Sequence, residues 1–216
     1  MKPEVFGMLL DGSPSKPSIS KESIHHLSKN VSGKPLVRPA WFLDTNQQGE
    51  GIVDVTTHLV DLVQWEAFPN QIINRSDIEI ISAKRWTTSL APNQFKNITG
   101  LDNYPEYLQK DVESDTLNIY CNGEINYKIK GKHAKVSVIW NYKAPVGTGD
   151  THQSSMCGTK SDLIIKQGEA ENFKPTLYVN ANQVENFELN LNQAIQSLQI
   201  DYPGICLLYT SDAADE

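Results

Sequence analysis

The chain has 216 residues, of which 39% are hydrophobic and 21% are charged, and its formal net charge is -7. This length and composition indicate one globular domain with enough apolar side chains to bury a core, and they exclude wholesale disorder. No apolar run approaches the roughly 18 to 20 residues of a membrane-spanning helix. The acidic balance, without a dense cluster of Lys and Arg, argues against binding to nucleic acid or to an anionic membrane surface.

The first forty residues are predicted to form a loop, a helix and an extended segment. Gly, Ser and Pro are frequent in residues 7–19, which is typical of a loop. Ser20 is a suitable N-cap for a helix that runs to Gly33, a residue type that often follows a helix end. Two prolines in residues 34–43 favour an edge strand or an extended connection.

A second helix is predicted over residues 52–65, directly after the glycine turn of residues 47–51. Leucine and valine cover its flanks, so we expect this helix to be largely buried. It also carries one polar stripe, formed by four side chains at i, i+4, i+7 and i+11: Asp54, His58, Asp61 and Trp65.

The middle of the chain has the pattern of β-strands. A strand is predicted over residues 78–86, followed by a long connection over 89–108 with one short helical turn. Apolar residues alternate on both sides of Asn122-Gly123, and this dipeptide is the preferred type I′ turn, so a hairpin is predicted there. Residues 133–142 are expected to form a further strand with its apolar side chains on one face.

The last part of the chain is predicted to contain a loop over residues 144–158, short strands over 162–166 and 176–179, and an amphipathic helix from Val184 to Leu198. Helices near both ends with consecutive antiparallel strands between them describe an α+β domain. We therefore predict an open, mostly antiparallel β-sheet with helices packed on one face.

Asp54, His58 and Asp61 form the densest group of ionisable side chains in a segment that is predicted to be buried. A histidine with a carboxylate one turn away can act as a general acid or base near neutral pH. The alternative is a core histidine that bonds the backbone and has no part in catalysis. A metal site is disfavoured because no further ligand follows at helical spacing.

Other motifs carry weaker signals. His25 and His26 are not expected to serve one site, because neighbouring residues on a helix point to different faces. His152 lies in a segment rich in Gly, Ser and Thr, where it either contacts a substrate or is solvated. The three cysteines lack the paired spacings of a zinc site or a disulfide framework. No P-loop, nucleophile elbow or dinucleotide-binding glycine fingerprint occurs.

Several stretches resemble a known family of enzymes. Residues 38–66, which contain Arg-Pro-Ala-Trp-Phe-Leu-Asp and Gln-Gln-Gly-Glu-Gly-Ile-Val-Asp-Val-Thr-Thr-His, are similar to the C-terminal domain of oxidoreductases of the glucose-fructose oxidoreductase, inositol dehydrogenase and MocA (Gfo/Idh/MocA) family. The similarity continues through residues 148–152, 174–178 and 202–204. It covers nearly all of residues 4–205.

The resemblance implies a fold, a cofactor and a catalytic pair. Members of this family combine an N-terminal Rossmann domain, which binds NAD or NADP, with an α+β domain that supports the substrate site. The family pattern Asp-x-x-x-His on the first long helix of that second domain matches Asp54 and His58. By resemblance, His58 exchanges the hydroxyl proton of the substrate, and Asp54 holds the substrate or orients the catalytic groups. Many relatives have glycine where this chain has Thr56.

The same resemblance implies substrate contacts and partners. We expect Asp61, His152 and Trp41 to contact a sugar or polyol substrate, and no metal or cofactor to bind to this chain by itself. A homo-oligomer is expected to form through the face of the sheet.

Both ends of the sequence carry predictions about its extent. Residues 206–216 match the in-frame translation of a sequencing-library adapter, so the predicted domain covers 1–205 and the tail 206–216 is an artefact. The Glu-Lys-Pro lysine and the glycine fingerprint of the Rossmann half do not occur in the sequence. We therefore expect an incomplete second domain that is inactive alone, because half of the site is missing. Nothing sets a compartment, so a cytoplasmic location is the default.

The leading hypothesis is the substrate-binding and catalytic-helix part of an NAD(P)-dependent oxidoreductase that acts on a sugar, a polyol or a related secondary alcohol. One alternative is a glycoside hydrolase of the same superfamily that uses NAD in a transient oxidation. Another is a non-catalytic module for binding or oligomerisation.

Overall fold

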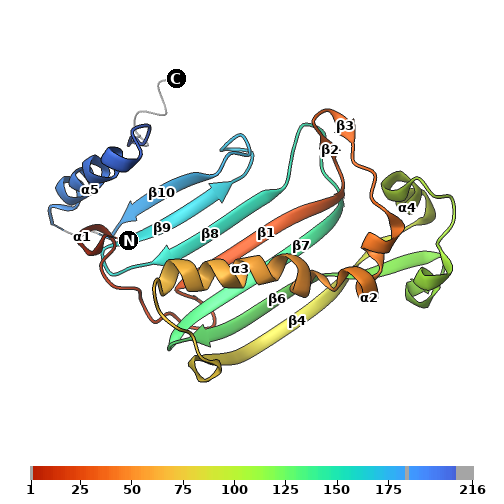
Figure 1. Cartoon of the computed structure of the whole chain (residues 1–216), viewed down its shortest axis with the longest axis horizontal. Helices are drawn as coiled ribbons and strands as arrows, with labels where there is room; N and C mark the ends of the chain where they lie inside the picture. Colours follow the sequence, from red (N-terminus) through yellow and green to blue (C-terminus); the bar gives the residue numbers. More distant parts are fainter. Residues whose placement is uncertain (1, 183–184, 208–216) are drawn as a thin grey trace.

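The computed structural model describes residues 2–182 and 185–207 and contains one large sheet with helices beside it (Figure 1). The eight-stranded sheet has the order β10-β9-β8-β1-β7-β6-β4, and β5 pairs with β6 off this path. Among these strands β1 and β7 form the parallel pair, and the other pairs are antiparallel. The predicted α+β fold with an open, mostly antiparallel sheet is confirmed. In chain order the strands are β1 Ile19–Ser28, β4 Ile78–Leu90, β5 Val112–Glu113, β6 Thr116–Ile129, β7 Lys132–Lys143, β8 Thr151–Cys157, β9 Ser161–Gln167 and β10 Thr176–Ala181.

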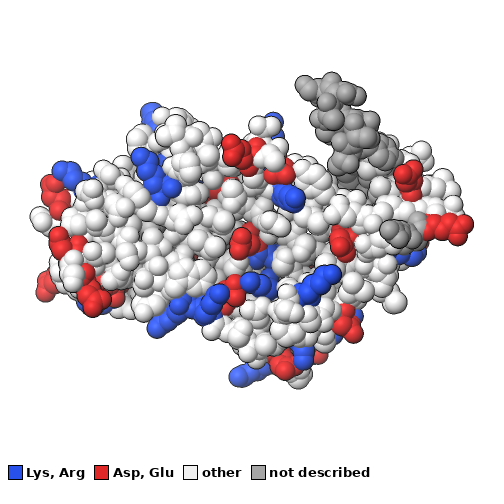
Figure 2. Space-filling view, turned by 180° about the vertical axis from the view of Figure 1, so that it is seen from behind, with Lys and Arg blue, Asp and Glu red and all other residues white. Residues whose placement is uncertain are grey.

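Helix α3 crosses one face of the sheet and contacts β6 and β7 (Figure 1). Figure 2 shows the molecule from the other side, where basic and acidic side chains are interspersed. No helix within the described ranges is both long and apolar enough to span a membrane. The helices are α1 Pro3–Phe6, α2 Thr45–Gln48, α3 Gly51–Ala67, α4 Pro92–Thr99 and α5 Phe187–Asp201. The short elements are β2 Asn30–Val31, β3 Lys34–Pro35 and the 3-10 helices η1 Ala40–Leu43, η2 Arg75–Asp77 and η3 Glu106–Asp111.

Two glycines let the start of α3 lie directly on the sheet. A Cβ atom on Gly51 would lie 1.7 Å from the carbonyl oxygen of Cys121 in β6, and a Cβ atom on Gly123 would lie 2.7 Å from Cβ of Ile52. Any larger side chain at these positions would push helix and strand apart. The glycines therefore set the height of the first turn of α3 above the sheet.

The prediction of a helix over residues 52–65 is confirmed, but the prediction that this helix is largely buried is wrong. One row of residues, including Thr56, Leu59 and Val63, packs on the sheet. Because α3 is covered from one side only, the opposite row points outward, and His58 and Asp61 are exposed. The valines and leucines on its flanks are divided between the two sides.

Two buried apolar clusters hold the helices to this face. The first joins α4 and η1 to the ends of β1, β4, β6 and β7, and the second lies beneath α3. Burial of such side chains contributes about 25 cal/mol for each Å² of apolar surface removed from water. The first cluster includes Leu43, Leu90, Phe95, Leu117 and Trp140, and the second includes Leu59, Val63, Tyr127, Val136 and Met156.

The predicted hairpin at Asn122-Gly123 is wrong, because β6 continues through both residues. Neither has the positive φ of a type I′ turn; the turn lies at Lys130-Gly131, where φ is 48° and 79°. Asn122 is buried and acts as a bracket between strands. Its Nδ2 donates to the carbonyl of Trp86 at 3.1 Å, and its Oδ1 accepts from the backbone N–H of Trp140 at 2.7 Å.

Replacing Asn122 by alanine is expected to destabilise the fold by about 2 to 3 kcal/mol, because it leaves a buried N–H and a buried carbonyl without partners. Chemical denaturation of the variant and the parent chain measures this difference. A hairpin-turn residue would tolerate the change almost without loss, so a difference below about 0.5 kcal/mol would contradict the bracket role.

The predicted helix from Ser20 to Gly33 is also wrong. Residues 19–28 form β1, which lies between β7 and β8 in the middle of the sheet. Ile19, Lys21 and Ser23 are buried at every second position, which is the period of a strand. Two of those three side chains are polar, so hydrophobicity alone concealed the alternation.

The remaining predictions are partly confirmed. The strands at 78–86, 133–142, 162–166 and 176–179 are present as β4, β7, β9 and β10. The predicted loop over 144–158 is wrong in its second half, which forms β8, because Ser154 and Met156 alternate as buried positions. The connection after β4 contains α4 and η3, more helix than was predicted. The C-terminal helix is confirmed as α5; Val184 and residues 208–216 of the predicted tail lie outside the described residues.

Candidate functional site

The exposed stripe of α3 places the predicted catalytic pair at the edge of the domain. His58 is exposed, which excludes the alternative of a buried core histidine. Asp54, one turn earlier, is half-buried where the first turns of α3 meet the sheet. A carboxylate and an imidazole one turn apart, both reachable from the same side of a helix, can bind and deprotonate a substrate hydroxyl.

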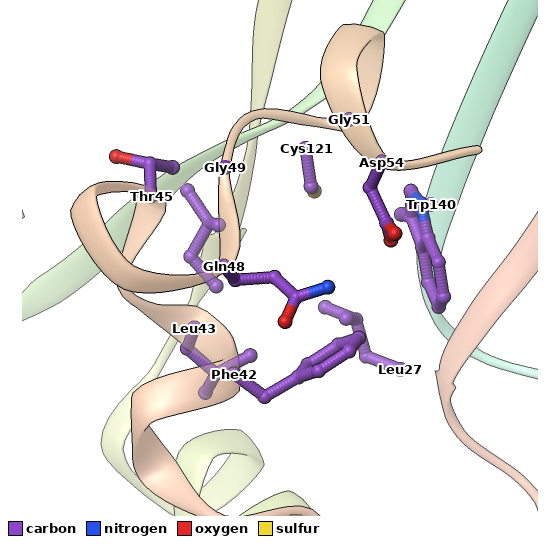
Figure 3. Close-up of a pocket in the computed structure, with 11 residues that line it drawn as sticks. Leu27, Phe42, Leu43, Thr45, Gln48, Gly49, Gly51, Asp54, Cys121 and Trp140 are labelled. Carbon is purple, nitrogen blue, oxygen red and sulfur yellow. The ribbon is translucent and has the colours of Figure 1, made fainter. Parts of the chain in front are cut away.

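Asp54 lines a pocket at the start of α3, and Figure 3 shows its carboxylate beside the indole of Trp140, with the side-chain amide of Gln48 extending into the same space. The lining of the pocket is mostly apolar, and Asp54 and Gln48 place polar groups in it. Besides these three residues its lining consists of Leu27, Phe42, Leu43, Thr45, Gly49, Gly51, Ile119 and Cys121.

His25 lies next to this pocket and is held from two sides. Its ring stacks on Trp140, with centroids 4.7 Å apart, and its Nδ1 lies 3.1 Å from Oδ2 of Asp150. The same carboxylate contacts Nδ1 of His26 at 3.3 Å and the ammonium of Lys29. The expectation that His25 and His26 do not share a site is therefore wrong, because the end of a strand lets both rings reach one loop carboxylate.

Asp150 is the charged centre of this cluster. Burial alone would raise the pKa of Asp150, but hydrogen bonds from His25 and Lys29 outweigh burial, so its pKa lies well below the ordinary value. The carboxylate therefore stays ionised at neutral pH and fixes the orientation of the His25 ring.

His152 lies on β8 and not in a loop, opposite Ser23 of β1. Its Nδ1 is 2.9 Å from Oγ of Ser23. Burial and the nearby charge of Lys21 lower the pKa of His152, so its ring is neutral at neutral pH. Lys21, Ser23 and His25 alternate along β1 and make a polar floor on the face that α3 covers.

Lys21 anchors the far end of α3 to this floor. Its side chain is 1% exposed, and its Nζ lies 2.7 Å from Oε2 of Glu66, which is 32% exposed. Removing Glu66 leaves a buried ammonium without a partner, whereas removing the ammonium leaves a carboxylate that water can reach.

We therefore expect Glu66→Ala to destabilise the chain by about 2 kcal/mol or more and Lys21→Met to cost less than about 1 kcal/mol. Thermal unfolding of the two variants at neutral pH compares them directly. If the two variants lose equal stability, or if Lys21→Met loses more, the burial of Lys21 does not determine the contribution of this ion pair to stability.

The structure separates the other predicted substrate residues from the Asp54 pocket. Asp61 borders a second hollow at the C-terminal end of α3, together with Trp65 and Phe68. Trp41 is 46% exposed on η1 and packs edge-on against Phe42, 6.5 Å between ring centroids.

Sequence reasoning missed the groups around Asp150. His25, Lys29 and Arg38 are brought together by the end of β1 and the segment after it, and Asp150 is added by the loop before β8. Asp150 lies in the stretch Thr148-Gly-Asp-Thr-His152 that resembles the family, but no spacing in the sequence links it to His25.

Comparison with known proteins identifies the family. The family model described as "Putative oxidoreductase C terminal domain" matches residues 1–214. The chain belongs to this oxidoreductase C-terminal domain family. Thr56 is buried on the row of α3 that packs on the sheet, and its Oγ1 donates to the carbonyl of Gly51 at 3.3 Å.

Solved structures show where this C-terminal domain occurs. A putative oxidoreductase from Parabacteroides merdae is 59% identical, with a TM-score of 0.93 over 97% of this chain and 49% of that chain. The domain thus spans about half the length of the Parabacteroides merdae protein. Two further structures are more distant. A putative oxidoreductase from Erwinia carotovora atroseptica is 13% identical, with a TM-score of 0.48 over 83% of this chain and 42% of that chain. A putative oxidoreductase from Thermotoga maritima is 14% identical, with a TM-score of 0.37 over 90% of this chain and 47% of that chain. No curated protein matches.

Proposed function

We propose that this domain is the substrate-binding and catalytic-helix part of an NAD(P)-dependent oxidoreductase that acts on a sugar, a polyol or a related secondary alcohol. The observation that supports it most is the position of Asp54 and His58, one turn apart at the accessible side of α3. The carboxylate of Asp150 is already bonded to cations, whereas no hydrogen bond engages the Asp54 carboxylate or the His58 ring among the described residues.

The described residues do not fit a dinucleotide themselves. The glycine-led start of α3 is the natural candidate for a pyrophosphate site, but the Cβ position of Gly51 points into the backbone of Cys121. Gly51 therefore serves the close approach of α3 to β6, and the sequence holds no dinucleotide-binding glycine fingerprint. We therefore propose that NAD or NADP is bound by another domain of the complete enzyme, where it would supply the hydride acceptor.

The roles proposed for this chain concern the proton and the substrate. His58 would take the hydroxyl proton of the substrate on a ring nitrogen as the alcohol is oxidised. Asp54 would accept hydrogen bonds from substrate hydroxyls, and Trp140 would pack against the carbon side of the substrate. The exposed stripe of α3 would face the cofactor domain.

The test uses a chimera in which this chain replaces the matching half of the Parabacteroides merdae protein. Sugars and polyols are assayed with NAD and NADP by absorbance of the reduced nicotinamide. The proposal expects net cofactor reduction with at least one secondary alcohol. Release of reducing sugar without net reduction would favour the glycoside hydrolase, and a folded chimera without either activity, beside an active parent protein, would favour a non-catalytic module.

We also propose that the complete enzyme is a homo-oligomer joined through the open sheet face of Figure 2. Ion pairs between neighbouring strands neutralise charges there, which favours contact with an identical surface: Glu124 bonds Lys135 at 2.8 Å and Lys84 at 3.3 Å, and Lys128 bonds Glu79 at 3.1 Å.

A further inference from the structure

Arg38 is a half-buried cation beside the Asp54 pocket. It lies between β3 and η1, where the chain passes the end of β1. Its Nε donates to the carbonyl of Leu27 at 2.9 Å, and its Nη2 donates to the carbonyl of His26 at 3.2 Å. A guanidinium group has five N–H donors, and three of them have no hydrogen-bond partner among the described residues.

Two aromatic rings contact this guanidinium. Its central carbon lies 4.4 Å from the centre of the Phe42 ring and 5.3 Å from that of Trp140. Both rings line the pocket that contains Asp54. These contacts hold the guanidinium beside the pocket, and its planar fork can bind a carboxylate or a phosphate with paired hydrogen bonds.

The charges around Arg38 leave it without a direct partner. Lys21 is paired with Glu66, and Lys29 is paired with Asp150. Arg38 makes no ion pair within residues 2–182 and 185–207, although the charges of Asp150 and Asp54 act on it from a distance. Burial lowers the pKa of Arg38, but a guanidinium stays protonated at neutral pH. Binding of an anion stabilises a half-buried positive charge that has no ion-pair partner.

We propose that Arg38 binds an oxyanion group of the substrate, a carboxylate or a phosphate. This inference rests on the proposed function and narrows its substrate class to an acidic or phosphorylated sugar or polyol. The anionic group would lie against the guanidinium edge, while the hydroxyl that reacts lies at Asp54 and His58. Arg38 would thereby select the substrate and set its direction in the site.

Direct binding to the 216-residue chain tests the proposal without cofactor or turnover. Isothermal titration calorimetry at low ionic strength compares three probes: D-gluconate, D-glucose 6-phosphate and the neutral polyol D-glucitol. We expect at least one anionic probe to bind about tenfold more tightly than D-glucitol or better, because a charge-assisted hydrogen bond is worth at least that factor. The relative affinities of gluconate and glucose 6-phosphate decide between carboxylate and phosphate.

Variants assign the site. Arg38→Gln is expected to lower the affinity for the anionic probe about tenfold or more and to leave the affinity for D-glucitol unchanged. Arg75→Gln, which removes an equal charge from the exposed η2, is the matched control and should bind as the parent chain does. Should Arg38→Gln lose its circular dichroism spectrum, Arg38→Lys replaces it. Lysine keeps the charge but lacks the fork, so several-fold weaker binding is expected.

Two results would overturn the proposal. The first is equal binding, or no binding, of the three probes to the parent chain. The second is a folded Arg38 variant that binds the anionic probe as tightly as the parent does, which would leave Arg38 as an anchor for Leu27 and His26 only. Neither result touches the proposed function, since a chimera that oxidises neutral polyols independently of Arg38 would still be an oxidoreductase.

Discussion

Replacing His58 by alanine is expected to lower kcat/KM of the chimera by about 100-fold or more, the usual contribution of a general acid or base. The side chain is exposed and has no hydrogen bond among the described residues, so the free energy of unfolding should change by less than about 0.5 kcal/mol. A loss of rate without a loss of stability separates a catalytic from a structural role. The measurements are initial rates of cofactor reduction and thermal unfolding of the same preparations.

Gln64→Ala is the matched control for His58→Ala. Gln64 lies on the same helix but borders the hollow at its C-terminal end, away from the Asp54 pocket. This variant should retain the rate of the parent chimera. Full activity of His58→Ala, or an equal loss in both variants, would contradict the catalytic assignment of His58.

Replacing Gly51 by alanine is expected to produce the largest loss of stability from one added methyl group. The new Cβ would lie 1.7 Å from the carbonyl oxygen of Cys121, a backbone atom that cannot rotate away. Helix α3 or strand β6 must move, at a cost of about 3 kcal/mol or more. For a domain of this size the melting temperature should fall by about 6 to 12 °C.

Gly149→Ala provides the control for Gly51→Ala. The nearest atom to a Cβ on Gly149 belongs to Phe173 and lies at 3.9 Å, which is ordinary contact. Its melting temperature should stay within about 2 °C of the parent, because the same change is made without a clash. A Gly51→Ala chain that melts with the parent would show that α3 does not lie directly on β6.

Helix α3 and the placement of Asp54 and His58 one turn apart could be predicted from the sequence, because this spacing is a local property of a helix. The exposure of the polar stripe of α3 could not be predicted from the sequence, because it depends on which elements cover the helix. Valines and leucines surround the stripe on both flanks, and only the docking of Thr56, Leu59 and Val63 on the sheet decides which side is buried.

The errors in the strands have one physical cause. The residues carry local signals for turns and helix caps, but pairing with distant strands decides their structure. Asn122-Gly123 has the composition of a turn, but the side chain of Asn122 is used to bracket β4 and β7, and Gly123 makes room for Ile52. Ser20 resembles a helix cap, yet its segment is paired on both edges by β7 and β8. Pairing partners distant in sequence leave no local signal.

The groups around Asp150 and Arg38 could not be predicted for the same reason. His25, Arg38 and Asp150 lie far apart in the chain and meet only because β1 pairs with β8 and the segment before η1 crosses the end of β1. Their residue types are ordinary surface types, and no spacing links them. Their chemistry becomes visible only with the fold.

Rescue of the His58→Ala chimera by added imidazole tests the central claim most directly. The site on α3 is open, so a free imidazole can reach the position of the missing ring. The account predicts that activity lost in His58→Ala returns in proportion to the concentration of neutral imidazole, while the parent chimera and the Gln64→Ala control do not respond. A variant that loses activity but gains nothing from imidazole at any pH would show that His58 does not carry the proton.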